Sequence, residues 1–198
     1  MRIIGGTLRS RRLEAPAGLS TRPTSDRLRE TLFNVLAPRI DGARFLDLFA
    51  GSGAVGLEAH SRGAARGDFV ERSPAALAVL RKNLASLGFG NGISSGVSVH
   101  AGSVEPVLRR FRTDAPFDLV FLDPPYDAAD AYAATLGLLG GGIARLLAPG
   151  ALVVAEHRKK EELEDCYGGL ERTRLLKQGD AALSFYGAVR SSEINAAG

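Results

Sequence analysis

The chain has 198 residues, of which 45% are hydrophobic and 24% are charged, a composition typical of globular proteins and not of disordered or low-complexity chains. A chain of this length predicts one domain with, at most, a small appendage. One cysteine and three scattered histidines exclude a disulfide framework and a Cys/His zinc site. No apolar stretch reaches the roughly 20 residues of a membrane helix. Residues 1–12 carry arginines where a signal peptide is apolar, so we expect a cytoplasmic protein that does not contact a membrane.

The positive charge is concentrated near the N-terminus. Residues 1–30 hold seven arginines and three acidic residues, whereas the formal net charge of the whole chain is +3, so the remainder is nearly neutral. Such a basic segment is typical of proteins that bind a phosphate backbone, although a solvated surface segment has the same composition. Residues 2–13 alternate in polarity and predict a short exposed strand pair that turns at Gly5-Gly6. An amphipathic helix is predicted to follow, capped by Thr24 or Ser25 and ending at Pro38.

From residue 43, short apolar runs alternate with helical stretches, a pattern that predicts βαβ units and a parallel sheet. The predicted strands are 44–48, 67–70, 97–100, 117–122 and 151–155, with helices over 54–60 and 74–87. Two later runs, 173–177 and 183–189, flank the turn signal Gln178-Gly179-Asp180, so we expect the sheet to end in an antiparallel pair. We therefore predict an N-terminal arm or lid (1–42), a main domain (43–190) and a flexible tail (191–198).

A glycine-rich loop joins the first predicted strand of the main domain to its first helix. Gly51, Gly53 and Gly56 have the G-x-G-x-x-G spacing, which lets a backbone turn tightly and approach a ligand at a helix N-terminus. Glu71 stands 20 residues after Gly51, where a carboxylate can accept hydrogen bonds from two ribose hydroxyls. The loop predicts a nucleoside-containing cofactor; the plainer interpretation is a tight turn followed by a surface glutamate. The candidate cofactor contacts are Asp47, Phe49, Ala50, Gly51, Ser52, Gly53, Glu71 and Arg72.

The acid before this loop favours one kind of nucleoside cofactor. Asp47 precedes the first glycine by four residues, where dinucleotide-binding proteins usually have apolar residues. A carboxylate there would repel a pyrophosphate, whereas it suits a ligand with a positively charged amino acid part, such as S-adenosylmethionine. The loop therefore favours methyl transfer over hydride transfer.

Asp123-Pro124-Pro125-Tyr126 follows the apolar run 117–122 directly. In a doubly wound sheet this is the carboxyl edge, where ligands bind. Two prolines fix φ and remove two backbone donors, so Asp123 and the Pro124 carbonyl form a rigid pair of acceptors that suits the exocyclic amino group of a nucleobase. Two accepted N–H bonds can orient the nitrogen lone pair towards a methyl donor, with Asp123 as the proton acceptor and Tyr126 stacked on the base. The alternative is a proline-rich turn with an incidental acid.

Four blocks of sequence, in the same order over most of the chain, resemble the RsmD-type bacterial methyltransferases of small-subunit ribosomal RNA. The blocks are Arg2-Ile3-Ile4-Gly5-Gly6; Arg22-Pro23-Thr24 with Asp26-Arg27 and residues 29–34; residues 47–56 with Leu57-Glu58-Ala59; and residues 123–126. The N-terminal blocks are the more specific, because amino-methyltransferases of DNA, RNA and protein glutamine share versions of the last block.

The resemblance implies an α/β, class I S-adenosylmethionine-dependent methyltransferase fold, which is Rossmann-like with a mostly parallel seven-stranded sheet and an antiparallel last strand. It implies activity of the 16S rRNA (guanine(966)-N(2))-methyltransferase type, with S-adenosylmethionine as donor, S-adenosylhomocysteine as product and no metal. The implied partner is small-subunit ribosomal RNA within a partly assembled subunit, and we expect a monomer. By analogy, Thr24 contacts the methionine carboxylate. Similar proteins carry Asp or Asn for the adenine where Ala101-Gly102-Ser103 stands here, which leaves Ser103 or backbone for that contact.

Several assignments and alternatives remain open at this stage. Besides guanine methylation, three other functions are open: methylation of adenine, cytosine or protein glutamine; a nicotinamide-dependent oxidoreductase; and a noncatalytic RNA-binding factor. The arginine cluster of Arg109, Arg110 and Arg112 is expected on an exposed helix face. Asp127 and Asp130 are expected to cap the next helix, and Cys166 is expected in a loop, without a functional role. The candidate RNA contacts are Arg9, Arg11, Arg12, Arg27 and Arg29.

Overall fold

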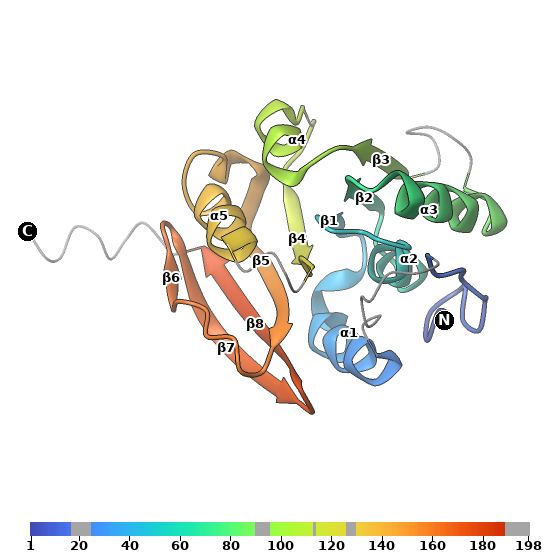
Figure 1. The fold of residues 1–198 in the computed structure, drawn as a ribbon, viewed down its shortest axis with the longest axis horizontal. Coiled ribbons are helices and arrows are strands. Elements are labelled where there is room, and N and C mark those ends of the chain that lie inside the picture. The colour runs from blue at the N-terminus through green and yellow to red at the C-terminus, as the bar shows by residue number, and fades with distance from the viewer. Residues whose placement is uncertain (17–24, 90–95, 113, 126–129, 189–198) are drawn as a thin grey trace, which may run out of the picture.

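A computed structural model describes residues 1–16, 25–89, 96–112, 114–125 and 130–188, and its centre is an eight-stranded sheet (Figure 1). The strand order is β3-β2-β1-β4-β5-β8-β7-β6. The pairs among β1 to β5 are parallel, whereas β8 runs antiparallel to both of its neighbours. The strands are β1 Arg44–Asp47, β2 Arg66–Glu71, β3 Val97–Ala101, β4 Phe117–Leu122, β5 Leu147–Arg158, β6 Cys166–Tyr167, β7 Leu170–Gln178 and β8 Ala181–Ala188.

This sheet confirms the predicted class I fold and corrects one detail. The sheet has eight strands and not seven, because the two residues of β6 pair with the start of β7 at the outer edge. Cys166 therefore lies in a strand, where the sequence predicted a loop. The predicted hairpin at residues 178–180 is confirmed, since β7 ends at Gln178 and β8 begins at Ala181.

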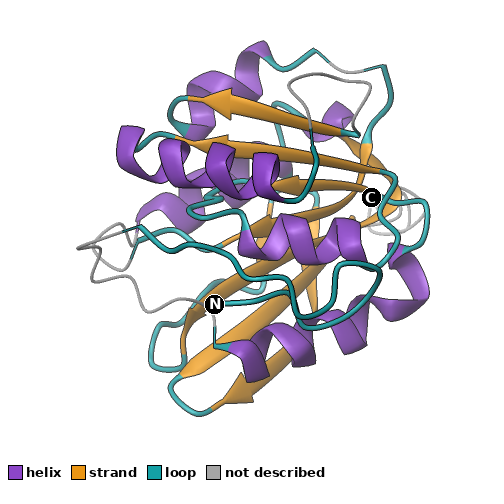
Figure 2. Ribbon diagram, turned by 90° about the vertical axis from the view of Figure 1, so that its right-hand side faces the viewer, coloured by secondary structure: helices purple, strands orange, loops and turns teal. Residues whose placement is uncertain are grey.

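Helices cover both faces of the sheet (Figure 2). One core cluster joins residues of α4 and α5 to one face, while two others join α1, α2 and α3 to the opposite face.

Ser25 caps α1 by accepting a hydrogen bond from the Leu28 amide at 3.2 Å, and α1 continues through Pro38, where the sequence predicted its end. The helices are α1 Asp26–Ile40, α2 Ala54–Ser61, α3 Pro74–Ser86, α4 Val104–Arg110 and α5 Asp130–Leu139, with a short 3-10 helix at Ala144–Leu146.

The N-terminal segment, residues 1–16, differs from the predicted exposed strand pair. It contains one antiparallel bridge, between Arg2 and Arg12, and its apolar residues Ile3 and Leu13 are buried. Ile3 is 1% exposed and packs in the cluster that includes Leu57 of α2. The segment therefore lies against α2, because its alternating apolar residues complete this core (Figure 1).

The parallel strands bring the predicted site residues to one edge of the sheet. β1, β2 and β4 end at Asp47, Glu71 and Leu122, and the carboxyl ends of parallel strands lie at the same edge.

No helix among the described residues is long and apolar enough to cross a membrane. The predicted tail, 191–198, lies outside the described ranges, and the boundary at residue 42 stays a prediction.

Candidate active site

A cavity of about 540 Å³ lies at this carboxyl edge. Its volume is within the range of small-molecule sites, roughly 300–1,000 Å³. Thr24 and Tyr126 are outside the described residues, and Gly53 is absent from the cavity wall. The other predicted cofactor and catalytic residues all contribute to the wall: Asp47, Phe49, Ala50, Gly51, Ser52, Glu71, Arg72, Ser103, Asp123, Pro124 and Pro125.

Glu71 and the glycine loop are joined by hydrogen bonds. The amide of Gly51 donates to Glu71 Oε2 at 2.8 Å, and the amide of Ser73 donates to Oε1 of the same carboxylate at 2.7 Å. These bonds fix the side chain of Glu71 at the cavity wall, where its remaining lone pairs can accept from a ligand. The position agrees with the ribose contact that we expect of Glu71.

Gly53 lies behind the loop, where its backbone packs against Leu80 of α3. Its φ is +82°, and a Cβ added there would lie 2.4 Å from Cδ1 of Leu80 in α3. The absent side chain therefore lets α2 begin close to α3. Gly53 does not line the cavity, and the cofactor contact that the spacing predicts for it stays a prediction.

Asp47 is buried at the end of β1, and its Oδ2 accepts a hydrogen bond from the Gly56 amide at 3.0 Å. Burial, together with a smaller effect of the Glu71 charge, raises the pKa of Asp47 to about 7, although the hydrogen bond from the Gly56 amide opposes the shift. The carboxyl group thus ties the end of β1 to the first turn of α2. A positively charged ligand group in the cavity would favour its ionised form.

Asp123 follows β4 directly and is half-buried, beside the buried Pro124. Burial raises the pKa of Asp123 well above its ordinary value, and the nearby charges of Glu156 and Asp47 raise it further. Glu156 is 6% exposed and belongs to β5. Leu122 of β4 pairs with Ala155 of β5, so Asp123 and Glu156 are the next residues after one paired position on neighbouring strands. Glu156 was not predicted from the sequence, because it continues a strand predicted to end at residue 155.

Among the described residues, no group of three or more His, Cys, Asp or Glu side chains is arranged to hold a metal ion.

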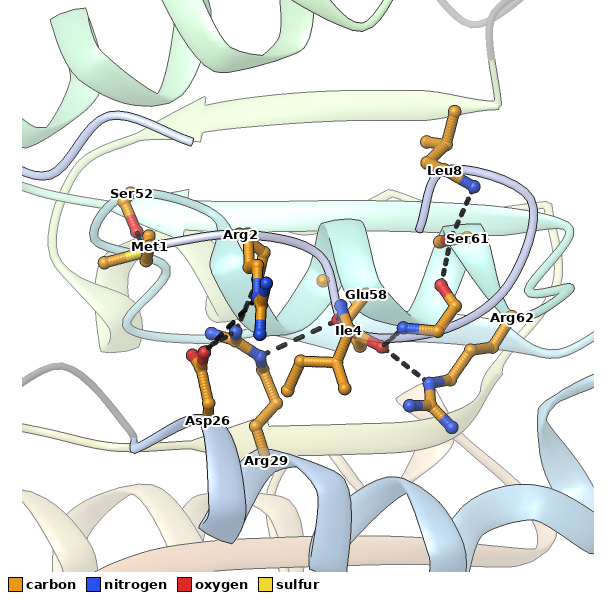
Figure 3. A network of polar contacts seen from close by, with 12 residues as sticks. Met1, Arg2, Ile4, Leu8, Asp26, Arg29, Ser52, Glu58, Ser61 and Arg62 are labelled. Atoms are coloured by element: carbon orange, nitrogen blue, oxygen red, sulfur yellow. Dashed lines mark hydrogen bonds and ion pairs between the residues drawn. The ribbon is translucent and has the colours of Figure 1, made fainter. Parts of the chain in front are cut away.

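Arg29 corrects one of the predicted RNA contacts. Its side chain is 1% exposed and lies on the buried face of α1, so it cannot serve as a surface contact to phosphate. Its Nη2 donates to the Arg2 carbonyl at 2.6 Å and to Asp26 Oδ1 at 2.9 Å, and its Nε lies 3.7 Å from Glu58 Oε2 (Figure 3). Burial lowers the pKa of Arg29, an effect that Glu58 opposes.

The remaining predicted RNA contacts, Arg9, Arg11, Arg12 and Arg27, are all exposed. Arg11 Nη2 also donates to the Ser86 carbonyl at 2.9 Å, at the end of α3. Their exposure is consistent with the expected role in binding phosphate, which stays a prediction.

Glu58 is a second buried acid of this region, and its contacts with several segments were not predicted from the sequence. Its carboxylate accepts hydrogen bonds from the amides of Ile4 and Gly5, at 2.7 and 2.8 Å, and from Arg62 Nε at 2.7 Å. Figure 3 shows how these contacts converge on Glu58 from the N-terminal segment, α1 and α2. The signal in the sequence was an acid within the apolar stretch that forms α2. Glu58 therefore joins the N-terminal segment to α1 and α2.

Comparison with known proteins gives consistent matches. The family model described as Conserved hypothetical protein 95 matches residues 1–187. Ribosomal RNA small subunit methyltransferase D of Escherichia coli is 46% identical over 126 residues, which are 64% of this chain and 60% of that protein. The protein of the same name from Haemophilus influenzae is 38% identical over 163 residues, 82% of this chain and 81% of its own length. The structure of a hypothetical protein from Thermus thermophilus superimposes with a TM-score of 0.76 at 35% identity, covering 93% of this chain and 98% of that one.

Proposed function

The chain belongs to the Conserved hypothetical protein 95 family, the RsmD-type S-adenosylmethionine-dependent RNA methyltransferases, and we propose that it methylates the exocyclic 2-amino group of one guanine in small-subunit ribosomal RNA. This is the 16S rRNA (guanine(966)-N(2))-methyltransferase type of activity. The observation that carries the proposal is the position of Asp123 and Pro124 on the wall of the same cavity as Glu71 and the glycine loop. A nucleoside cofactor and an amino group can therefore meet in one site.

The cavity residues fit S-adenosylmethionine. Glu71 is held at the wall as a hydrogen-bond acceptor for ribose, and the half-buried Gly51 presents backbone beside it. Asp47 is a buried carboxyl group whose ionised form a cationic amino acid part would stabilise. When bound, S-adenosylmethionine supplies a methyl group on a positively charged sulfonium and leaves as S-adenosylhomocysteine.

Asp123 and Pro124 are the residues that we expect to hold the guanine amino group. The carboxylate and the Pro124 carbonyl each accept one N–H, and the two prolines keep the acceptors rigid. The amino nitrogen gains the methyl group and loses one proton, and Asp123 accepts that proton. The raised pKa of Asp123 makes it a stronger base than an exposed carboxylate, which favours proton transfer from the amino group.

The ribosomal substrate is supported by the names of the relatives and by the exposed arginines of the N-terminal segment. We further propose that the enzyme acts in the cytoplasm, as a monomer, on a partly assembled small subunit. Methylation of adenine, cytosine or glutamine by the same acceptors is the alternative that product analysis separates. Family membership contradicts the oxidoreductase and the noncatalytic factor that the sequence alone leaves open.

The test of the site is the Asp123→Asn variant, which removes the proton acceptor with little change in shape. We expect kcat for methyl transfer to small subunits to fall by about 10²–10⁴-fold, with the Kd for S-adenosylhomocysteine within about threefold of the unmodified enzyme. Asp130→Asn is the matched control, because Asp130 is an exposed acid at the start of α5. Full activity of Asp123→Asn would refute the assignment.

A further inference from the structure

Arg29 contributes to the cavity wall although its side chain is 1% exposed. Arg29 and Arg72 are the two basic side chains that line the cavity among the described residues. Arg72 follows Glu71, the residue that we expect at the ribose. Arg29 comes from α1, which packs on the sheet face that carries Phe45 of β1 and Phe121 of β4. The cavity thus has one exposed cation beside Glu71 and one buried cation supplied by α1.

The guanidinium of Arg29 is incompletely hydrogen-bonded. Nη2 has two acceptors, the Arg2 carbonyl and Asp26 Oδ1, but the buried Nε has none among the described residues. Glu58 Oε2 lies 3.7 Å from this Nε, which is too far for a hydrogen bond. Buried donors in native proteins nearly always have a partner, so the unpaired Nε, which faces Glu58, shows that the protein neighbours of Arg29 do not fully compensate its guanidinium.

The charges around Arg29 also leave capacity for an anion. Glu58 already accepts three hydrogen bonds, one of them from Arg62, and therefore divides its charge between two arginines. Asp26, the other acid, has a side chain that is 53% exposed and hence well solvated. A carboxylate placed in the cavity would add to the compensation of the buried charge of Arg29 that these two partners supply.

We propose that Arg29 binds the carboxylate of the methionine part of S-adenosylmethionine, while Glu58, Asp26 and the Arg2 carbonyl hold its guanidinium in place. This inference rests on the proposed use of S-adenosylmethionine. The carboxylate is the only anionic group of that cofactor, and a planar guanidinium is the side chain best matched to a carboxylate. Arg29 is thus a cofactor-binding residue and not the RNA contact that the sequence predicted.

The test compares two probes by isothermal titration calorimetry: S-adenosylmethionine and its decarboxylated form, which keeps the sulfonium and the amine. The unmodified protein should bind S-adenosylmethionine more tightly by about 10- to 100-fold, as expected of a hydrogen-bonded ion pair in a cavity. Arg29→Gln should reduce this preference to less than about threefold while binding the decarboxylated probe nearly as well as before. Arg29→Lys, which keeps the charge and loses the planar fork, should give an intermediate preference and serves if the glutamine variant does not fold.

Arg62→Gln is the control, because Arg62 pairs with the same Glu58 and does not line the cavity. This variant should keep the preference for the carboxylate even if its stability falls. The inference is overturned if Arg29→Gln and Arg29→Lys keep the full preference, or if the unmodified protein binds both probes equally. Binding of neither probe by the unmodified protein would instead overturn the proposed cofactor, and the inference with it.

Discussion

Arg29 of α1 and Glu58 of α2 form an ion pair in the interior of the protein: Nε and Oε2 are 3.7 Å apart, and the side chains are 1% and 0% exposed. The pair lies beneath the N-terminal segment, whose Ile4 and Gly5 amides donate to the same carboxylate. Two charges removed from water are costly unless each is compensated, so the stability of this region depends on all partners being present. The pair links the N-terminal segment to α1 and α2 (Figure 3). Arg29 also lines the cavity.

Glu58→Gln should lower the free energy of unfolding by about 3–5 kcal/mol, because it leaves the buried charge of Arg29 without its main compensation. Urea unfolding followed by circular dichroism measures this change. Glu30→Gln, on the exposed side of α1, makes the same chemical change in water and should stay within about 0.5 kcal/mol. Equal effects of the two variants would show that the buried network does not stabilise the fold.

Gly53→Ala should also destabilise the protein, for a steric reason. Its φ of +82° disfavours any L side chain, and its Cβ would lie 2.4 Å from Leu80 Cδ1. Strain and overpacking of this kind cost about 1–3 kcal/mol each. Gly137→Ala in α5 is the opposite case, since nothing lies within 4 Å of its added Cβ, and it should be neutral or stabilising by up to about 1 kcal/mol. Thermal unfolding of both variants checks the sign, and a stabilised Gly53→Ala would contradict the packing described here.

The exposed arginines of the N-terminal segment should contribute affinity that depends on salt. We expect the combined Arg9→Ala, Arg11→Ala and Arg12→Ala variant to bind a fragment of 16S ribosomal RNA more weakly. The slope of log K against log salt is negative and should become less negative by about 0.7–0.9 for each phosphate that the variant no longer neutralises. Arg109→Ala with Arg110→Ala, on the exposed face of α4, is the control and should leave the slope unchanged. An unchanged slope in the triple variant would remove the N-terminal segment from the RNA interface.

Activity should fall on the acid side of its pH profile as Asp123 becomes protonated. The pKa of Asp123 is raised by burial and then by Glu156, so this loss should begin nearer neutrality than the ordinary pKa of 3.8 would give. Glu156→Gln removes a neighbouring negative charge, lowers the pKa of Asp123 and should move the acid limb of kcat to lower pH. The exposed Glu162→Gln should leave the limb in place. A limb that does not move in Glu156→Gln would show that the two carboxyl groups do not interact.

The elements of the fold were predictable because their signals are local. Pro124 stands two residues after the end of β4 and Gly51 four residues after the end of β1, and β4 itself was predicted over the range that it occupies. β6 could not be predicted, since a strand of two residues has no alternating pattern and exists only because β7 lies beside it. β5 was predicted too short at both ends, because polar Glu156 and the Pro149-Gly150 pair within it are typical of loops.

The candidate site shows the same division. Glu71 and Asp123 were predictable because each directly ends or follows a strand. Arg29 was misassigned because it was counted with the basic segment, although its spacing from Leu32, Phe33 and Leu36 places it on the apolar face of α1. Its pairing with Glu58 joins residues 29 positions apart on different helices, and no sequence spacing predicts such a contact.

The proposed reaction is tested most directly by identifying its product. Labelled S-adenosylmethionine would be supplied to small ribosomal subunits that lack the modification and to their protein-free RNA, followed by mass analysis of the nucleosides. We expect 2-methylguanosine, formed by the unmodified enzyme and not by Asp123→Asn. Label in methylated adenosine, cytidine or protein glutamine, with no 2-methylguanosine in either substrate, would contradict it.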